Sequence, residues 1–390
     1  MKWLADRLLS WASILDDATR AQAERAAGMP FVRPHLALMP DAHLGKGATV
    51  GSVIPTVGAV MPAAVGVDIG CGMIAVRSQH RGAELAGRDL ATLRRSIERA
   101  IPLSAGHYNR AVLPGSSTER RVDELQALAA TAGFEPDAYA STWPVQLGSL
   151  GSGNHFIEVS VDELDRVWLF LHSGSRGIGN KIATRHIAIA RDRCARHRVQ
   201  LPDRDLAYLT EDGPELDAYV NELRWAQHFA LLNREEMMDR VIDCFGRWHE
   251  PVIERERINC HHNYTEREHH LGEDVWLTRK GAIDASAGRP GLIPGSMGTA
   301  SYVVTGLGNE LALRSAPHGA GRRYSRSAAR RTFSLAQLRE AMRGIEYRDT
   351  AAFLDEIPQA YKPIDKVMAD AADLVRVRHT LRQLVNVKGD

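Results

Sequence analysis

Glycine-rich turns recur along the chain, and the segments that contain them favour short strands joined by tight turns. Glycine accounts for 33 of the 390 residues and permits backbone conformations that other residues rarely adopt. Segments 36–78, 142–180 and 259–322 combine such turns with short apolar runs, whereas 79–135 and 181–250 carry helical patterning. Because such turns are scattered through the chain and neither an internal repeat nor a low-complexity linker divides it, we expect one mixed α/β (α+β) domain.

Several individual elements can be predicted from their residue pattern. Val167–Leu171 is a continuous apolar run and predicts a buried strand. Leu90–Ala100 and Pro214–Phe245 repeat apolar residues at helical spacing and predict two helices. Met1–Leu15 predicts an amphipathic N-terminal helix, and Leu335–Val375 predicts helices interrupted by prolines.

Composition leaves nucleic-acid binding open. The 49 basic and 48 acidic residues give a formal net charge of +1, and a balanced chain can still hold a local basic cleft. Four cysteines without a CxxC pair do not indicate a disulfide framework in a chain of this length. No run approaches the ~18 apolar residues that span a bilayer. We expect one domain of residues 1–390, no membrane partner and a cytoplasmic location, where thiols stay reduced and can bind metal.

Four short segments concentrate side chains that can bind metal, each in or beside a glycine-, serine- or asparagine-rich turn. Their candidate ligands are Asp68, Cys71, His155, His172 and His262. A thiolate, a carboxylate and three imidazoles could hold two divalent ions, with the sulfur bridging them. Taken singly, each histidine is also typical of a hydrogen-bonding loop residue, and Cys71 of a small buried apolar side chain. Ligand type alone favours zinc.

A second unusual segment runs from Ser315 to Arg323 and places His318 at the head of a glycine loop. Gly319 and Gly321 would let the backbone approach an anion closely, and two arginines follow. A neutral imidazole is a competent nucleophile toward phosphorus. The alternative is a glycine turn with a structural histidine and solvated arginines. Neither the P-loop pattern nor the dinucleotide fingerprint occurs in its required context, which argues against a standard nucleotide-binding fold.

Taken together and in this order, these motifs resemble the RtcB family of RNA ligases. The match runs from about residue 36 to the closing Val387-Lys388-Gly389 and covers most of the chain. The motifs that carry it are Pro40-Asp41-Ala42-His43-Leu44-Gly45-Lys46-Gly47, Val67-Asp68-Ile69-Gly70-Cys71-Gly72-Met73, Gly153-Asn154-His155-Phe156-Ile157-Glu158, Leu171-His172-Ser173-Gly174-Ser175-Arg176, His262-Asn263-Tyr264 and His318-Gly319-Ala320-Gly321-Arg322.

The resemblance implies an RtcB-like fold, with strands and glycine loops around a central two-metal cleft and helices at the periphery. It also implies two manganese ions and GTP as cofactors. Asp68, Cys71 and His155 would hold one ion, and Cys71, His172 and His262 the other. Manganese conflicts with the zinc preference of the ligand types, but it is the ion that the resemblance implies. His318 would attack the α-phosphorus of GTP and become guanylylated.

The resemblance also assigns the nucleotide pocket. Its members would be Asn154, Arg176 and Arg322 as phosphate contacts, Lys280 as a further phosphate contact, Glu158 and Lys388 around the guanine, Gly319 and Gly321 beside the nucleophile, and Ser296 and Tyr361 as further lining. The chain departs from the family at Tyr324, where a methionine is usual, and in carrying Asp390 after the terminal glycine.

The implied reaction joins RNA 2′,3′-cyclic-phosphate or 3′-phosphate ends to 5′-hydroxyl ends, in tRNA splicing or RNA repair. A cyclic phosphate is first opened to a 3′-phosphate, GMP then passes from the histidine to that phosphate, and the 5′-hydroxyl finally expels GMP. We expect a monomer and leave open an activator protein of the archease type. Arg326, Arg330 and Arg331 are candidates for RNA contact by charge alone, and a solvated helix face is their alternative.

Three alternatives remain at this point. A metal-dependent 2′,3′-cyclic phosphodiesterase would need the metal ligands but not His318. An enzyme that caps 3′-phosphates of DNA or RNA with GMP would use the same first steps as the ligase. An RNA-end-binding protein without turnover would have no use for a nucleophile.

Overall fold

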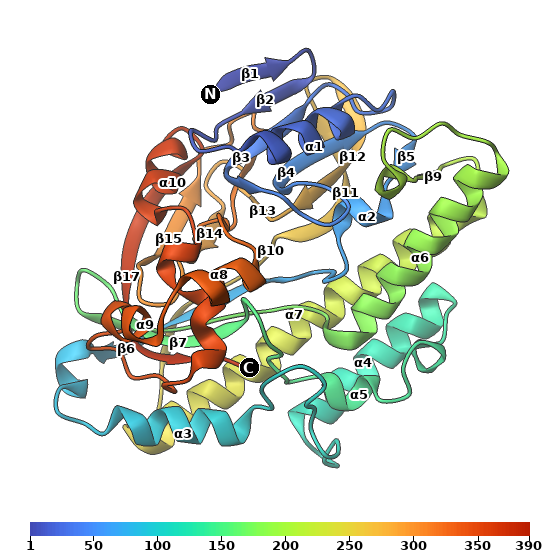
Figure 1. Ribbon diagram of the computed structural model, residues 1–390. Coiled ribbons are helices and arrows are strands. Elements are labelled where there is room, and N and C mark those ends of the chain that lie inside the picture. The colour runs from blue at the N-terminus through green and yellow to red at the C-terminus, as the bar shows by residue number, and fades with distance from the viewer.

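The computed structural model describes residues 1–390, and most of its strands belong to two sheets (Figure 1). The larger sheet is antiparallel at every pairing. Its seven strands are, in spatial order, β10 (Glu254–His261), β6 (Gly72–Arg81), β8 (Arg166–Ser173), β7 (Phe156–Val161), β17 (Val375–Val387), β15 (Ser301–Gly306) and β14 (Pro290–Ile293).

The second sheet is joined to the first by β10 and β11, which follow one another in the chain. Its six strands are, in order, β1 (Lys2–Ala5), β2 (Leu8–Ser10), β3 (Leu36–His43), β4 (Val50–Thr56), β12 (Glu273–Lys280) and β11 (Asn263–His270). Two small sheets complete the set, formed by β5 (Ala59–Val60) with β9 (Leu209–Thr210) and by β13 (Ala282–Asp284) with β16 (Ser315–Pro317).

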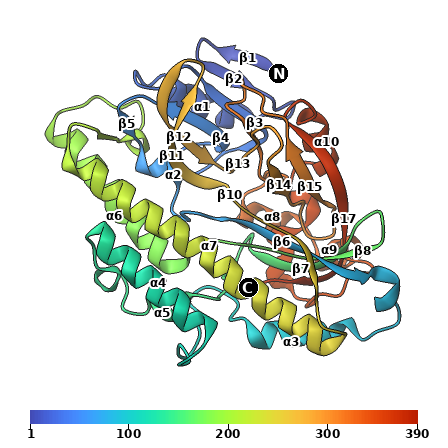
Figure 2. The ribbon, with the colours of Figure 1, turned by 180° about the vertical axis from the view of Figure 1, so that it is seen from behind.

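The long helices lie together on one side of the sheets, as both views show (Figures 1 and 2). Helix α7 (Pro214–Trp248) is their centre, because it packs against β6, β8 and β10 and also against α3 (Leu90–Ala100), α4 (Ser117–Ala132) and α6 (Arg176–Arg196). The other α-helices are α1 (Asp17–Ala27), α2 (Pro62–Val65), α5 (Trp143–Gln146), α8 (Arg326–Thr332), α9 (Leu335–Ala341) and α10 (Ile364–Asp370).

The structure confirms the mixed α/β fold and most of the predicted elements. The helix at Leu90–Ala100 has the predicted bounds, with Asp89 as its N-cap. Val167–Leu171 forms the fully buried interior of β8. Helix α7 is a deeply buried element rather than a peripheral one, with Arg234 among its fully buried side chains. The single-domain organisation stays a prediction.

The predicted helix at Met1–Leu15 is wrong. The segment forms strands β1 and β2, which pair with each other, and β2 extends the second sheet along β3. The physical reason is long-range: the backbone groups of β2 find partners in β3, and the Leu8 and Leu9 side chains are completely or almost completely buried there. Predicted helices in the C-terminal segment do form, but from Val375 the chain continues as strand β17. No helix of the structure combines the length and apolar character that crossing a bilayer requires.

Candidate active site

The register of the larger sheet brings the predicted metal ligands to one edge. Gly72 in β6 lies opposite His261 in β10, and Met73 lies opposite His172 in β8. Phe156, the first residue of β7, is also opposite His172. Residues just outside these strand ends therefore face one another. These are Asp68 and Cys71 before β6, His155 before β7 and His262 after β10.

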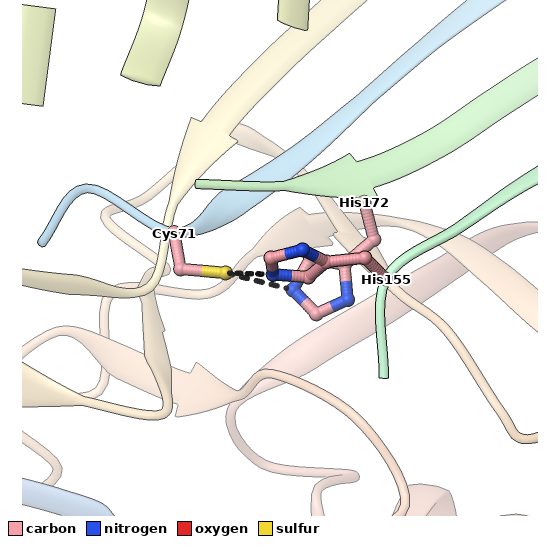
Figure 3. A group of neighbouring side chains, drawn as sticks. All are labelled: Cys71, His155 and His172. Atoms are coloured by element: carbon pink, nitrogen blue, oxygen red, sulfur yellow. Dashed lines mark hydrogen bonds between the residues drawn. The ribbon is translucent and has the colours of Figure 1, made fainter. Parts of the chain in front are cut away.

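All five predicted ligands converge on one point. The Cys71 Sγ lies 3.4 Å from His155 Nε2 and 3.2 Å from His172 Nε2 (Figure 3). The His155 Nε2 is also 3.0 Å from Asp68 Oδ2, and the His172 Nε2 is 2.8 Å from His262 Nε2. The ligand atoms of Cys71, His155 and His172 all lie within 4.8 Å of one another, close enough to hold one metal ion. The short distance between the Nε2 atoms of His172 and His262 raises the question of which ring nitrogens carry protons.

The Nδ1 atom of each imidazole is held by an oxygen acceptor. These contacts join His155 to the Leu150 carbonyl at 2.9 Å, His172 to the Asn154 carbonyl at 3.1 Å and His262 to the Asn263 side-chain oxygen at 3.2 Å. The Nδ1 atoms of His172 and His262 therefore donate their protons, and the Nε2 atoms of these two rings present lone pairs. Burial lowers the pKa of His172 and His262 well below the usual range, which keeps both rings neutral. Lone pairs that converge without a proton between them suit a cation.

The remaining ligands complete a donor set that fits divalent metal. The Cys71 thiol is almost fully buried, and burial together with the neighbouring Asp68 carboxylate raises its pKa well above the ordinary value. A bound cation would reverse this effect, because the thiolate is the form that binds metal. At Gly174 an added Cβ would lie 2.2 Å from Asp68 Oδ1, so this position requires glycine for the carboxylate to reach the cluster.

Two consecutive residues of α7, missed in the sequence analysis, tie the ligand-bearing segments together. The Arg234 guanidinium is completely buried and has no carboxylate within salt-bridge distance. It donates to the Gly70 carbonyl at 2.8 Å, to the Ser173 carbonyl at 3.2 Å and to Asn259 Oδ1 at 2.7 Å. These three acceptors lie beside Cys71, His172 and the strand that leads to His262.

Asn233 performs the same role for the loop before His155. Its side-chain oxygen accepts from the Gly148 N–H at 2.7 Å, and its amide donates to the Ser149 and Gly174 carbonyls at 3.2 and 3.1 Å. The signal in the sequence is a polar pair among the buried apolar residues of α7. A buried helix accepts such a pair only where hydrogen bonds satisfy it.

Replacing Arg234 by methionine is expected to weaken metal binding about 10- to 100-fold, because residues that orient metal ligands have effects of this size. The same change removes donors from two carbonyls and one amide oxygen and lowers the free energy of unfolding by about 3 kcal/mol. Cobalt titration followed by the thiolate-to-cobalt absorption measures the first effect, and thermal unfolding the second. The control is Arg247→Met on the same helix, since the Arg247 side chain is 65% exposed and its only ion pair is with Asp243. Equal cobalt affinity of both variants would contradict the assignment.

His318 follows strand β16 and is oriented by a buried carboxylate. Its Nδ1 donates to Asp41 Oδ2 at 2.6 Å, and its backbone N–H donates to the same oxygen at 3.2 Å. The Asp41 side chain is completely buried. At Gly321 the φ angle is +74°, and an added Cβ would lie 2.1 Å from the Asp41 carbonyl oxygen, so glycine is required for this approach. Asp41 thereby leaves the lone pair of His318 on Nε2.

One cavity of about 290 Å³ contains most of the predicted site. The ring of His318 lies 4.5 Å from that of His262, centroid to centroid, so the candidate nucleophile adjoins the predicted metal ligands. The predicted residues that line the cavity are Asp68, Cys71, Asn154, Glu158, His172, His262, Lys280, Ser296, His318, Gly319, Gly321, Arg322, Tyr361 and Lys388. His155 lies behind this surface, and Arg176 lies next to it with Nη1 at 3.3 Å from His155 Nδ1.

The far end of the cavity holds an unsatisfied carboxyl group. Register between β7 and β17 places Glu158 opposite Asn386, whose amide donates to Glu158 Oε1 at 3.2 Å. The other carboxyl oxygen, Oε2, is buried and has no partner. Burial raises the pKa of Glu158 to about 8. Lys388, directly after β17, reaches Glu356 at 3.4 Å. A ligand with hydrogen-bond donors would satisfy Glu158.

Two predicted phosphate contacts already donate to protein atoms. The Arg322 guanidinium donates to Tyr361 Oη at 2.8 Å and to the Asp355 carbonyl at 2.6 Å. The Lys280 ammonium donates to the Lys46 carbonyl at 2.6 Å, and burial lowers its pKa to about 8. Both residues line the cavity, and their contact with phosphate stays a prediction.

Comparison with known proteins places the chain in a family. The family model described as tRNA-splicing ligase RtcB matches residues 22–389. The RNA-splicing ligase RtcB of Escherichia coli is 47% identical over 384 residues, which cover 95% of this chain and 94% of that protein. The tRNA-splicing ligase RtcB of Pyrobaculum aerophilum is 30% identical, with coverages of 94% and 90%. The RNA-splicing ligase RtcB of Mycobacterium tuberculosis is also 30% identical, with coverages of 89% and 94%. The chain therefore belongs to the RtcB family.

Proposed function

We propose that this protein is a GTP-dependent RNA ligase that joins 3′-phosphate or 2′,3′-cyclic-phosphate ends to 5′-hydroxyl ends through a guanylylated histidine. The observation that carries the proposal is the placement of His318, with its Nδ1 held by Asp41 and its ring beside the metal-ligand cluster. Membership of the RtcB family supports it, since relatives in that family are named RNA-splicing and tRNA-splicing ligases.

The first step transfers GMP to the protein. The Nε2 lone pair of His318 attacks the α-phosphorus of GTP, an N–P bond forms, and the bond to the β-phosphate oxygen breaks with loss of pyrophosphate. Asp41 stabilises the positive charge that develops on the imidazole ring. Glu158 would accept hydrogen bonds from the N–H groups of the guanine base, which adenine lacks in that arrangement.

The later steps move GMP to RNA and release it. An oxygen of the RNA 3′-phosphate attacks the phosphorus on His318, and the N–P bond breaks, which restores the imidazole. The 5′-hydroxyl of the second strand then attacks the activated 3′-phosphorus, loses its proton, and GMP departs. A 2′,3′-cyclic end needs prior opening by water.

We propose that the cluster binds two divalent cations and that both are manganese. Asp68, Cys71 and His155 would hold one and Cys71, His172 and His262 the other, with Asn154, Arg176, Lys280 and Arg322 nearby as phosphate contacts and Ser296, Gly319, Gly321, Tyr361 and Lys388 lining the nucleotide pocket. When bound, the ions would stabilise negative charge on the transferring phosphoryl groups.

The decisive experiment incubates the purified protein with GTP and manganese in the absence of RNA and reads the intact mass. We expect a gain of one GMP that is labile to acid, as a phosphoramidate should be. RNA carrying a 3′-phosphate and RNA carrying a 5′-hydroxyl are then added, and the adduct is expected to disappear as joined RNA forms. Opening of cyclic phosphate without any adduct would favour a phosphodiesterase instead. Loss of the adduct with capped but unjoined ends would favour a capping enzyme.

Replacing Asp41 by asparagine is expected to slow GMP transfer to His318 by about 10⁴-fold, because an amide can donate to Nδ1 and favour the wrong tautomer. Single-turnover formation of the adduct measures the rate. Cobalt binding should be unchanged, since Asp41 does not touch the metal ligands. An unaltered rate in this variant would show that His318 acts without Asp41.

A further inference from the structure

A second cleft opens from the proposed active site. It has a volume of about 500 Å³ and shares Ser296 and Tyr361 with the cavity that holds His318. Its charged and aromatic lining includes Arg323, Tyr324, Phe333 and Lys362, and we call it the Arg323–Tyr324 cleft. Its walls come from the segment after His318 and from residues 358–364.

The cleft holds a free cation and a positioned aromatic ring. Arg323 is exposed and makes no side-chain hydrogen bond or ion pair, although its backbone N–H is anchored to the Ala360 carbonyl at 2.8 Å. The Tyr324 ring packs edge-to-face on Phe333 with centroids 5.3 Å apart and stays partly exposed. A rigid aromatic ring beside an unpaired arginine suits a nucleobase and its phosphate.

The other cleft next to the active site is less suited to a polyanion. It shares Arg326 and Glu356 with the main cavity and is also lined by Arg330, Asp355 and Asp390. Its two arginines are paired with the buried carboxylates of Asp355 and Glu356. Two cations against three acidic side chains leave it net negative, whereas the Arg323–Tyr324 cleft has two cations and no acidic residue.

We propose that the Arg323–Tyr324 cleft binds single-stranded RNA next to the reacting phosphate, with a base stacked on Tyr324 and a phosphodiester at Arg323. This inference rests on the proposed ligase function. Because RNA is a polyanion, the strand would extend from the active site along the positively charged Arg323–Tyr324 cleft. The exposed guanidinium of Arg323 would be its first contact there. Lys362 adds charge but no contact, since its ammonium already donates to the Ile14 and Ala42 carbonyls, both at 2.6 Å.

The test measures binding of a fluorescent ten-nucleotide RNA to the manganese-loaded protein by anisotropy, without GTP. Tyr324→Ala is expected to weaken binding about 10- to 100-fold, and Tyr324→Phe to restore it, because stacking needs the ring and not the hydroxyl. Arg323→Gln is expected to reduce the slope of log K against log salt by about 0.7, the contribution of one phosphate contact on single strands. Arg120→Gln, an exposed arginine on α4, is the matched control and should change neither value.

Two RNAs distinguish which strand occupies the cleft. If the variants lose more affinity for RNA that carries a 3′-phosphate, the cleft binds the activated strand. If they lose more affinity for RNA that carries only hydroxyl ends, the cleft binds the 5′-hydroxyl strand. Wild-type affinity and wild-type salt dependence in Tyr324→Ala and Arg323→Gln would overturn the proposal.

A measurement on the unaltered protein covers the case in which a variant fails to fold. RNA carrying 4-thiouridine at each end is crosslinked by light, and the modified residue is found by mass spectrometry. Crosslinks on Tyr324 or Phe333 support the cleft, whereas crosslinks confined to Ser152, Arg330 or Phe353, which line the other cleft, overturn it. Failure of the ligase proposal looks different, because the wild type would then form no GMP adduct at all.

Discussion

Replacing His318 by alanine is expected to abolish both the GMP adduct and the joining of RNA ends. The imidazole is the only side chain in the proposed mechanism that forms a bond to phosphorus, so no slower route to the adduct remains. Intact mass after incubation with GTP and manganese measures the first loss, and a gel assay with labelled RNA measures the second. Opening of a 2′,3′-cyclic phosphate should persist, because that step does not use the nucleophile.

The control for this variant is His269→Ala, which removes an exposed histidine of β11 that is 65% accessible. It should keep the full adduct and full joining. Cobalt affinity of His318→Ala should equal that of the wild type, because His318 is not among the metal ligands. RNA joining that survives in His318→Ala would end the proposal of a histidine–GMP intermediate.

Replacing Cys71 by alanine is expected to remove high-affinity metal binding and, with it, GMP transfer and RNA joining. The sulfur contacts both His155 and His172, so in our proposal it is shared by both ions, and its loss affects two sites at once. The loss should exceed the roughly 100-fold that follows from removing a residue that only orients a ligand. Calorimetric titration with manganese and the absence of the thiolate-to-cobalt absorption measure it.

The Cys71 thiol also predicts how metal affinity changes with pH. The pKa of the Cys71 thiol is raised by burial, so the protonated thiol is the resting form and metal binding releases its proton. Affinity should therefore fall as pH falls, and the wild type should release more protons per metal than Cys71→Ala. Cys194→Ala is the control, because Cys194 is equally buried but lies in the helical core near Tyr208. Equal proton release in wild type and Cys71→Ala would contradict the thiolate assignment.

The sequence by itself determined the elements whose pattern is local. Helix Leu90–Ala100 and the strand around Val167–Leu171 are confirmed because apolar periodicity reports directly on which face is buried. The candidate metal ligands were also singled out from the sequence, since each lies in or beside a glycine-, serine- or asparagine-rich turn. Their binding of metal stays a prediction. The family followed from the order of the motifs.

Only the tertiary structure decided what joins residues that are distant in the chain. Asp41 and His318 are 277 positions apart, and no local pattern links a carboxylate in one sheet to an imidazole after another. Asn233 and Arg234 are polar residues among the apolar residues of α7, and only the placement of the strand ends around them shows which backbone groups they bind. The N-terminal segment, predicted as a helix, became strands β1 and β2 because β3 offered its backbone hydrogen bonds. The spacing of apolar residues predicts which side chains are buried, but it does not predict which group each of them contacts. That partner is set by the packing of segments that are distant in the chain.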